Sequence, residues 1–275
     1  MVPADFHRFR LLLPIGFEAE KVVPWMPEIL FAVEISQGIG WRIMDRMRVW
    51  QTIRASSLSR HVHGRAYAAL VLSGGYEEAG DYGRFRVNAG DVIFHQQFEA
   101  HLDRFSETGA AVLNLPLHTG SFCTAGIAKV ADVDAVARVA ERSRRDAIEL
   151  LFSLAVAGTR QPADWPDELA AALVRNPSLK LSQWGEKNGI APWTLSRGFE
   201  LVFGVSPEAF RARTRARHAL RSIRNTQTSL ANIAVELGFA DQSHMTRSVT
   251  QLTGIGPRAW RSAANRFKTG RNFGA

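Results

Sequence analysis

Near the carboxyl end of the chain, apolar residues recur at helical spacing and then stop at a glycine. Leu230, Ile233, Ala234 and Leu237 lie three or four residues apart, and Gly238 follows them. Residues at this spacing share one face of a helix, and a glycine after them supplies the positive φ that ends a helix tightly. The pattern predicts a short helix, a tight turn and a second helix.

The second helix is expected to be apolar on one side only. Asp241 is placed to cap its first turn, and Met245 and Val249 form its buried stripe. Small Ala234 suits a close crossing of the two helices. The other side of the second helix is polar, and its residues are Gln242, Ser243, His244 and Arg247.

The same unit occurs a second time, earlier in the chain. Five pairs of residues repeat at a separation of 49 or 50 positions: Leu181/Leu230, Gly189/Gly238, Arg197/Arg247, Gly204/Gly254 and Pro207/Pro257. Two copies of one supersecondary unit explain this register better than chance does. The first copy has Pro192 in the first turn of its second helix, with Leu195 and Phe199 facing inward. Its polar face carries Trp193, Ser196 and Arg197, and a buried Trp193 is an equally good interpretation.

Two helix-turn-helix units indicate a DNA-binding function. Such units place their second helix in the major groove, where Gln can bond adenine and Arg can bond guanine. The alternative for each arginine is a surface ion pair, and two arginines at equivalent repeat positions argue against it. Candidate phosphate contacts are Thr194, Arg211, Arg215 and Thr246.

A long helix is expected between the units. Ser206 caps it, Pro207 starts it, and Phe210, Ala216 and Ile223 belong to its apolar stripe. Five arginines line its other sides, some expected on phosphate and others on a solvated surface: Arg211, Arg213, Arg217, Arg221 and Arg224.

The last hundred residues resemble the DNA-binding domain of the AraC/XylS family of bacterial transcription regulators. Residues at the positions of that family's signature include Arg215, Ala219, Ile223, Thr226, Ser229, Leu230, Ile233, Ala234, Gly238, Phe239, Ser243, Arg247, Gly254 and Pro257. The chain departs from the pattern at Met245 and Val249, where the family usually has phenylalanines, and at Thr250, where it usually has a lysine. The resemblance implies double-stranded DNA, a small-molecule effector and RNA polymerase as partners, and a homodimer.

Residues 58–118 show a different pattern, with short strand-like runs separated by glycines. This predicts a β-barrel or jelly roll. The spacing resembles that of a cupin: His61 and His63 begin one motif, Gly90 begins the next, and His101 falls at its histidine. Tyr67 stands where a cupin usually has its glutamate ligand. Gln96 and Phe98 replace its usual proline and glycine.

The histidines leave two interpretations open. Three imidazoles can hold a metal with an open position, which would permit a metal-dependent cupin enzyme. The resemblance implies an effector bound without metal, and the missing carboxylate agrees with it, so we expect no metal, no cofactor and no catalytic residues. The histidines then either line an effector pocket or bond strand backbones. The expected pocket residues are His61, His63, Tyr67, Phe94 and His101, with Trp50, Phe85 and Phe98 as further wall or core residues.

The remaining segments set the domain boundaries. We expect an N-terminal cupin-like domain over 1–160, a linker over 161–167 and the DNA-binding domain over 168–275, with units near 179–203 and 229–253. Residues 132–158 read as one helix that contacts either a second subunit or its own barrel. The pattern does not place residues 1–57. The expected fold is therefore multidomain α+β.

Charge and composition agree with this division. The net charge is +8, and residues 176–275 hold 15 Lys and Arg against 5 Asp and Glu. The excess of positive charge therefore lies in the DNA-binding half. Cys123 is the single cysteine, which excludes a disulfide within the chain. We expect no signal peptide, no membrane partner and a cytoplasmic location.

The sequence therefore predicts an effector-responsive activator of transcription. Two alternatives remain open. One is a metal-dependent cupin enzyme with an attached DNA-binding domain, and the other is an architectural protein that binds DNA without sequence preference.

Overall fold

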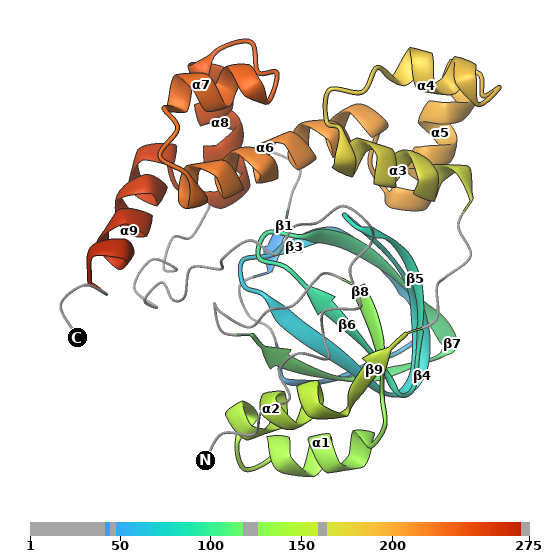
Figure 1. Ribbon diagram of the computed structural model, residues 1–275. Helices are drawn as coiled ribbons and strands as arrows, with labels where there is room; N and C mark the ends of the chain where they lie inside the picture. Colours follow the sequence, from blue (N-terminus) through green and yellow to red (C-terminus); the bar gives the residue numbers. More distant parts are fainter. Residues whose placement is uncertain (1–41, 45–47, 118–125, 159–163, 271–275) are drawn as a thin grey trace.

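The computed structural model describes residues 42–44, 48–117, 126–158 and 164–270. Along the described residues, eight strands come first, two helices and a short strand follow, and the rest of the elements are helices, so the α+β expectation is confirmed. The strands curl into a barrel, the helical domain lies over one end of it, and two helices lie at the other end (Figure 1). Most of residues 1–57, which the sequence did not place, fall outside the described residues.

The barrel is one sheet, antiparallel except where β1 runs parallel to β3. The central strands are long: β7 pairs with β2, β3 and β4, and β4 also pairs with β5 and β6. The strands are β1 (Arg42–Met44), β2 (Trp50–Ile53), β3 (Ser57–His63), β4 (Tyr67–Gly80), β5 (Gly83–Asn88), β6 (Asp91–His95), β7 (Ala100–Pro116), β8 (Gly126–Val130) and β9 (Ala155–Ala157).

Residues 132–158 form two helices and a strand, so the prediction of one helix is wrong. Helix α1 (Val133–Ala140) ends before Glu141, and α2 (Arg144–Leu154) begins after Ser143. The Ser143 hydroxyl accepts a hydrogen bond from the Asp146 amide at 3.2 Å, which caps a new helix. The apolar face of both helices packs on their own barrel, through Val136, Ala140, Ala147, Ile148 and Leu151.

The helical domain contains both expected units. The first unit is α4 (Leu181–Lys187) and α5 (Pro192–Phe203), and the second is α7 (Leu230–Glu236) and α8 (Gln242–Thr253). Gly189 and Gly238 have φ of 66° and 70°, as the turns require. The other helices are α3 (Trp165–Arg175), α6 (Pro207–Asn225) and α9 (Pro257–Gly270).

Helix α3 begins at Trp165, so the chain is already helical over the end of the expected linker. Asp164 caps α3 and accepts from Arg84 on β5 at 2.9 Å. None of the helices in the described ranges is long and apolar enough to cross a membrane.

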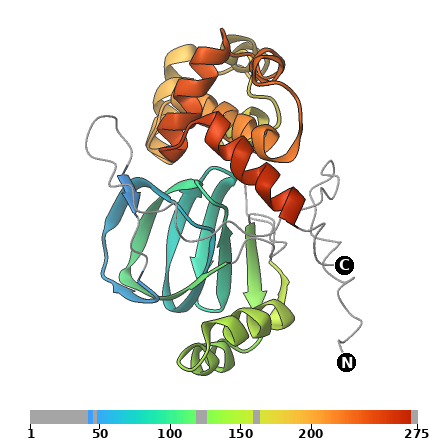
Figure 2. The same cartoon turned by 90° about the vertical axis from the view of Figure 1, so that its left-hand side faces the viewer.

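Helix α6 joins the two units and packs against the end of the barrel (Figure 2). The apolar core of the second unit continues into Val62, Phe98 and Ala100 of the barrel, and that of the first unit into Ala79 and Leu102. The two domains therefore share buried apolar surface on both sides of α6, in addition to polar contacts.

Gly185 shows why the first unit uses glycine inside a helix. A Cβ added there would stand 2.9 Å from the Ile190 carbonyl oxygen and 3.1 Å from Leu195 Cδ1. We expect Gly185→Ala to lower the free energy of unfolding by about 1–3 kcal/mol, although alanine favours helix by about 1 kcal/mol. Urea unfolding measures this, with exposed Ser182→Ala as control. A more stable Gly185→Ala variant would contradict the close crossing.

Candidate functional site

The second helix of the first unit begins with exposed side chains. Trp193 is 67% exposed, which decides between the two interpretations of this residue, and the Arg197 guanidinium lies 5.8 Å from the centre of its ring. Thr194 and Arg197 are exposed and Ser196 is half-buried. The expected inward residues of α5, Leu195 and Phe199, are 4% and 0% exposed.

Helix α8 repeats this arrangement in the second unit. Gln242, Ser243 and Arg247 are exposed, while Met245 and Val249 are fully buried as expected. Asp241 caps the helix by accepting from the His244 amide at 2.6 Å. The half-buried ring of His244 meets Phe239 edge-on at 5.4 Å, so it also fixes the turn. Thr246 is half-buried.

Two of the arginines expected on phosphate hold the units in place. Arg211 donates to the Leu179 carbonyl at 3.1 Å. Arg215 donates to the Gly238 carbonyl at 3.0 Å and to the Pro177 carbonyl at 3.1 Å, so it links the turn of the second unit to the segment that precedes the first. Their phosphate contacts, like those of Thr194 and Thr246, stay predictions.

Three other arginines of α6 face the barrel, which corrects the expectation that they line a DNA-facing or solvated side. Arg224 donates to the Gln97 side chain at 3.3 Å. Arg217 donates to Asp81 Oδ2 at 3.0 Å and to the Tyr82 hydroxyl at 2.6 Å. Arg213 lies 3.4 Å from Asp81 Oδ2 and donates to the Phe98 carbonyl. The barrel's own Arg60 also pairs with Asp81.

Asp81 is therefore the centre of a buried polar contact between the domains. Its side chain is 2% exposed, and its Oδ2 also accepts from the Ala100 amide at 2.9 Å. Burial by itself would raise the pKa of Asp81, but Arg213, Arg217 and Arg60 outweigh burial and hold that pKa below its usual value. Arg60 extends the contact by donating to the Phe203 carbonyl of α5 at 3.1 Å.

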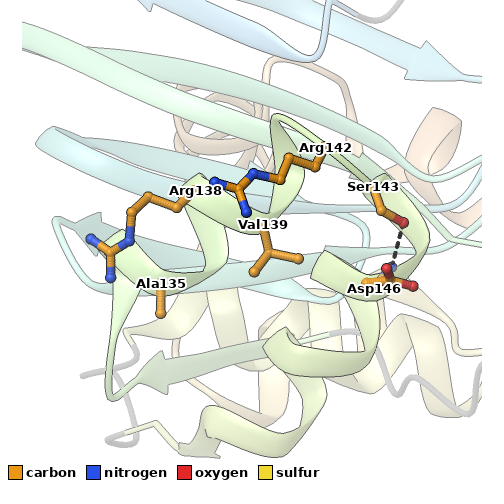
Figure 3. A pocket seen from close by; sticks show the side chains of 6 residues that line it. All are labelled: Ala135, Arg138, Val139, Arg142, Ser143 and Asp146. Atoms are coloured by element: carbon orange, nitrogen blue, oxygen red, sulfur yellow. Dashed lines mark hydrogen bonds between the residues drawn. The ribbon is translucent and has the colours of Figure 1, made fainter.

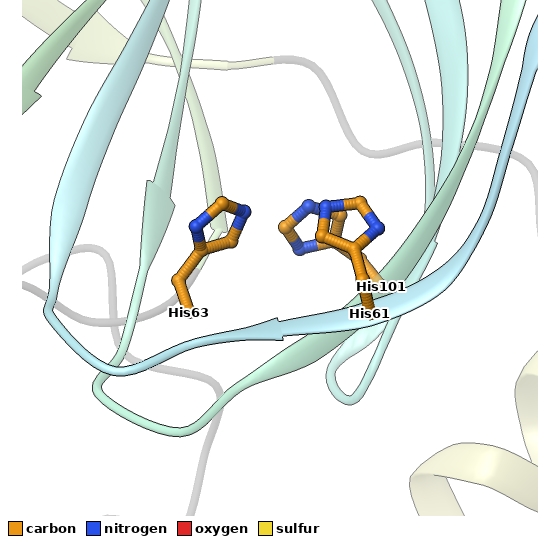
Figure 4. A group of neighbouring side chains, drawn as sticks. All are labelled: His61, His63 and His101. Carbon is orange, nitrogen blue, oxygen red and sulfur yellow. The ribbon is translucent and has the colours of Figure 1, made fainter. Parts of the chain in front are cut away.

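The barrel interior brings together four of the five expected pocket residues. His61 and His63 on β3 face His101 on β7 (Figure 4), with ring centres 4.4 Å and 5.3 Å from His101. The Tyr67 hydroxyl lies 3.5 Å from His101 Nε2. These side chains come from neighbouring strands because β7 pairs with both β3 and β4.

Three buried residues of this cluster were missed from the sequence: Glu78, His95 and Asp103. His95 Nε2 lies 3.5 Å from Glu78 Oε2, and His101 Nε2 lies 3.7 Å from Asp103 Oδ2. Burial lowers the pKa of His95 and His101 well below the usual value, raises the pKa of Glu78, and raises the pKa of Asp103 to about 8. The sequence signal for these three residues is a polar side chain at a strand position that faces the barrel interior. This position can be recognised only once the pairing register of the strands is known.

Phe94 does not belong to this cluster, so its assignment to the pocket is wrong. It lies on the other face of β6, in the core between the barrel and helices α1 and α2, where its ring stacks on Phe152 of α2 at 5.6 Å. The alternation of side chains along a strand separates Phe94 from neighbouring His95. Trp50 is 44% exposed and therefore is no interior wall, whereas Phe85 packs at the edge of the barrel core.

Phe98 has φ of 61°, at the position where a cupin usually has glycine. This left-handed backbone conformation costs a non-glycine residue about 1 kcal/mol or more of free energy. Its amide donates to the His63 carbonyl at 3.0 Å, its carbonyl accepts from Arg213, and its ring meets Trp260 edge-on. The strained residue is thus held by the contact between the domains.

A cavity of about 500 Å³ lies between α1 and α2, away from these sites (Figure 3). Val139 and Ala135 line it together with Arg138, Arg142 and Asp146, whose side chains are exposed. Water screens exposed charges strongly, so this cavity offers little for binding a specific ligand.

Comparisons with known proteins agree on the helical domain. Residues 184–263 match the family model described as a helix-turn-helix domain. The HTH-type transcriptional regulator ExsA of Pseudomonas aeruginosa is 31% identical over 93 residues, which make up 34% of this chain and 34% of ExsA. The virulence regulon transcriptional activator VirF of Yersinia enterocolitica is 33% identical over 78 residues, 28% of this chain and 29% of VirF.

The match with these curated relatives is thus confined to about a third of their length. Among solved structures, ToxT from Vibrio cholerae is 12% identical with a TM-score of 0.38, over 78% of this chain and 99% of ToxT. The structural similarity is too low to add to the argument.

Proposed function

Because residues 184–263 match a helix-turn-helix domain and part of the chain is similar to two transcription regulators, we propose that this protein is a sequence-specific DNA-binding regulator of transcription of the AraC type, acting as an effector-responsive activator. One observation carries the proposal. Helices α5 and α8, at equivalent places in two repeated units, both present an exposed polar face that includes an arginine, Arg197 in one and Arg247 in the other.

The long helix α6 sets the geometry of binding. It runs between the two units, and Arg215 ties the turn of the second unit, at Gly238, to Pro177, which precedes the first unit. Recognition helices of two units read successive major grooves when they lie about 34 Å apart. We propose that α5 and α8 enter successive grooves from a single subunit, with Trp193, Gln242 and Ser243 beside the arginines.

The test is a selection of binding sites from random DNA at near-physiological salt. We expect the wild type to enrich two blocks about one helical turn apart. Arg197→Ala should weaken the sequence preference in one block and Arg247→Ala that in the other. Each variant should bind the selected site about tenfold to hundredfold more weakly, because a bidentate arginine–guanine contact contributes about 1–3 kcal/mol.

The control is Arg144→Ala, which removes the same charge from an exposed position on α2, at the far end of the barrel. It should leave both blocks and the affinity unchanged. Enrichment of no motif, or equal small losses in all three variants, would indicate the architectural DNA binder instead.

The partners other than DNA remain parts of the proposal. We propose that a small-molecule effector binds the barrel, that the protein contacts RNA polymerase, and that it forms a homodimer. The apolar face of residues 132–157 packs on its own barrel, so these residues do not support the proposed homodimer. We also propose that the protein is not an enzyme, as its regulator relatives suggest.

A further inference from the structure

A group of buried side chains in the barrel has the composition of a metal site. Glu78 on β4, His95 on β6 and His101 on β7 each offer one donor atom, and the three atoms all lie within 4.8 Å of one another. His95 Nε2 and Glu78 Oε2 are 3.5 Å apart. Two ligands on one tetrahedral ion stand about 3.4 Å apart when each bond is near 2.1 Å.

The same side chains hold polar atoms that the described part of the protein leaves without hydrogen-bond partners. These atoms are Glu78 Oε1, His95 Nδ1, His101 Nδ1 and Asp103 Oδ1. The side chains of Glu78, His95 and His101 are only 1–3% exposed. An unpartnered buried polar group costs about 1–3 kcal/mol, and four in one place are unusual. A metal ion takes one ring nitrogen from each histidine and an oxygen from Glu78, so it would offset part of this cost.

We propose that Glu78, His95 and His101 bind one divalent transition-metal ion, of the class of zinc(II) or iron(II). Two imidazoles with one carboxylate suit these ions, whereas magnesium and calcium prefer oxygen ligands. Asp103 lies 3.7 Å from His101 Nε2, beside the three proposed ligands. An apolar molecule in this place would leave all the polar atoms unpartnered.

This set is favoured over the three histidines that the sequence picked out. His61, His63 and His101 also place donor atoms within 4.8 Å of one another, but they supply no negative charge. Burying a dication among neutral ligands is costly, and a carboxylate ligand offsets part of its charge. The sequence-based expectation of no metal followed from Tyr67 standing in the usual glutamate's place. Glu78, further along the same strand, supplies the carboxylate.

The site is independent of the proposed function, and the metal alone tests it. Full-length protein is first stripped with a chelator and then titrated with zinc(II) in a calorimeter. We expect one ion per chain. Glu78→Gln and His95→Ala should each weaken binding by at least about a hundredfold, because each removes a ligand. The matched control is the double variant His61→Ala, His63→Ala, which removes two imidazoles from the same cluster and should change affinity less than about threefold.

A second measurement guards against variants that fail to fold. Cobalt(II) bound to the wild-type protein should absorb visible light as a four- or five-coordinate ion with nitrogen ligands, and His95→Gln should change that spectrum. The proposal is overturned if the wild type binds no ion, or if the His61→Ala, His63→Ala variant loses binding while Glu78→Gln and His95→Ala keep it. The latter result would place the ion on the three histidines.

Discussion

Replacing Asp81 with asparagine is expected to lower the free energy of unfolding by about 3–5 kcal/mol. Asp81 is the shared carboxylate of Arg60, Arg213 and Arg217, whose side chains are 3%, 7% and 14% exposed. An amide keeps the shape but not the charge, so three guanidinium groups remain buried together without a counter-charge. Two of them belong to α6, and the loss therefore weakens the packing of the barrel on the DNA-binding domain.

Urea unfolding followed by circular dichroism measures this effect. Glu77→Gln is the matched control, because Glu77 also pairs with arginines, Arg104 at 3.3 Å and Arg86 at 3.9 Å, but its side chain is 27% exposed. We expect that control to lose less than about 1 kcal/mol. Equal stability of Asp81→Asn and the wild type would mean that the two domains do not pack this way in solution.

The same carboxylate predicts a dependence on pH. The pKa of Asp81 in the folded protein is below its usual value, so the carboxylate stabilises the fold fully above about pH 4 and loses that effect as the pH falls through the lowered pKa. Between pH 5 and about pH 3 the wild type should therefore lose more unfolding free energy than Asp81→Asn does. Parallel curves for the two proteins would show that Asp81 is not held as an ion.

Phe199→Ala is expected to lower the free energy of unfolding by about 3–5 kcal/mol and to disable the first unit. The Phe199 ring is 0% exposed and stacks on Phe203 at 4.6 Å, with Phe210 of α6 edge-on at 5.3 Å. Truncation leaves a cavity at the point where α5 meets α6. Because α5 carries Arg197, the block of DNA read by the first unit should be lost before the other block.

Leu201→Ala on the same helix is the control, because Leu201 is 76% exposed and its truncation opens no cavity. Thermal unfolding and the DNA selection described above check both variants. A loss of both blocks in Phe199→Ala would show that the units fold as one body, whereas a loss comparable to that of Leu201→Ala would contradict the buried position of Phe199.

The sequence predicted the helical domain well because its signals are local. Ser229 and Asp241 cap the helices that follow them, Gly238 has the positive φ of a tight turn, and Met245 and Val249 are buried. A cap, a glycine turn and an apolar stripe each involve residues within one or two helical turns. The break at Ser143 was equally local, since a serine three residues before Asp146 is a capping signal, but it was overlooked.

Only the tertiary structure decided the contents of the barrel and its contact with the helices. Glu78, His95 and His101 meet because three strands pair in one register, and a shift of one residue would turn each side chain to the other face. Arg213 reads as a solvated helix residue until Asp81, far away in sequence, is placed against it. The sequence by itself determined where helices start, stop and repeat, through interactions between near neighbours. Which charges are buried and paired depends on contacts between distant residues, and those form only when the sheet closes and α6 packs upon it.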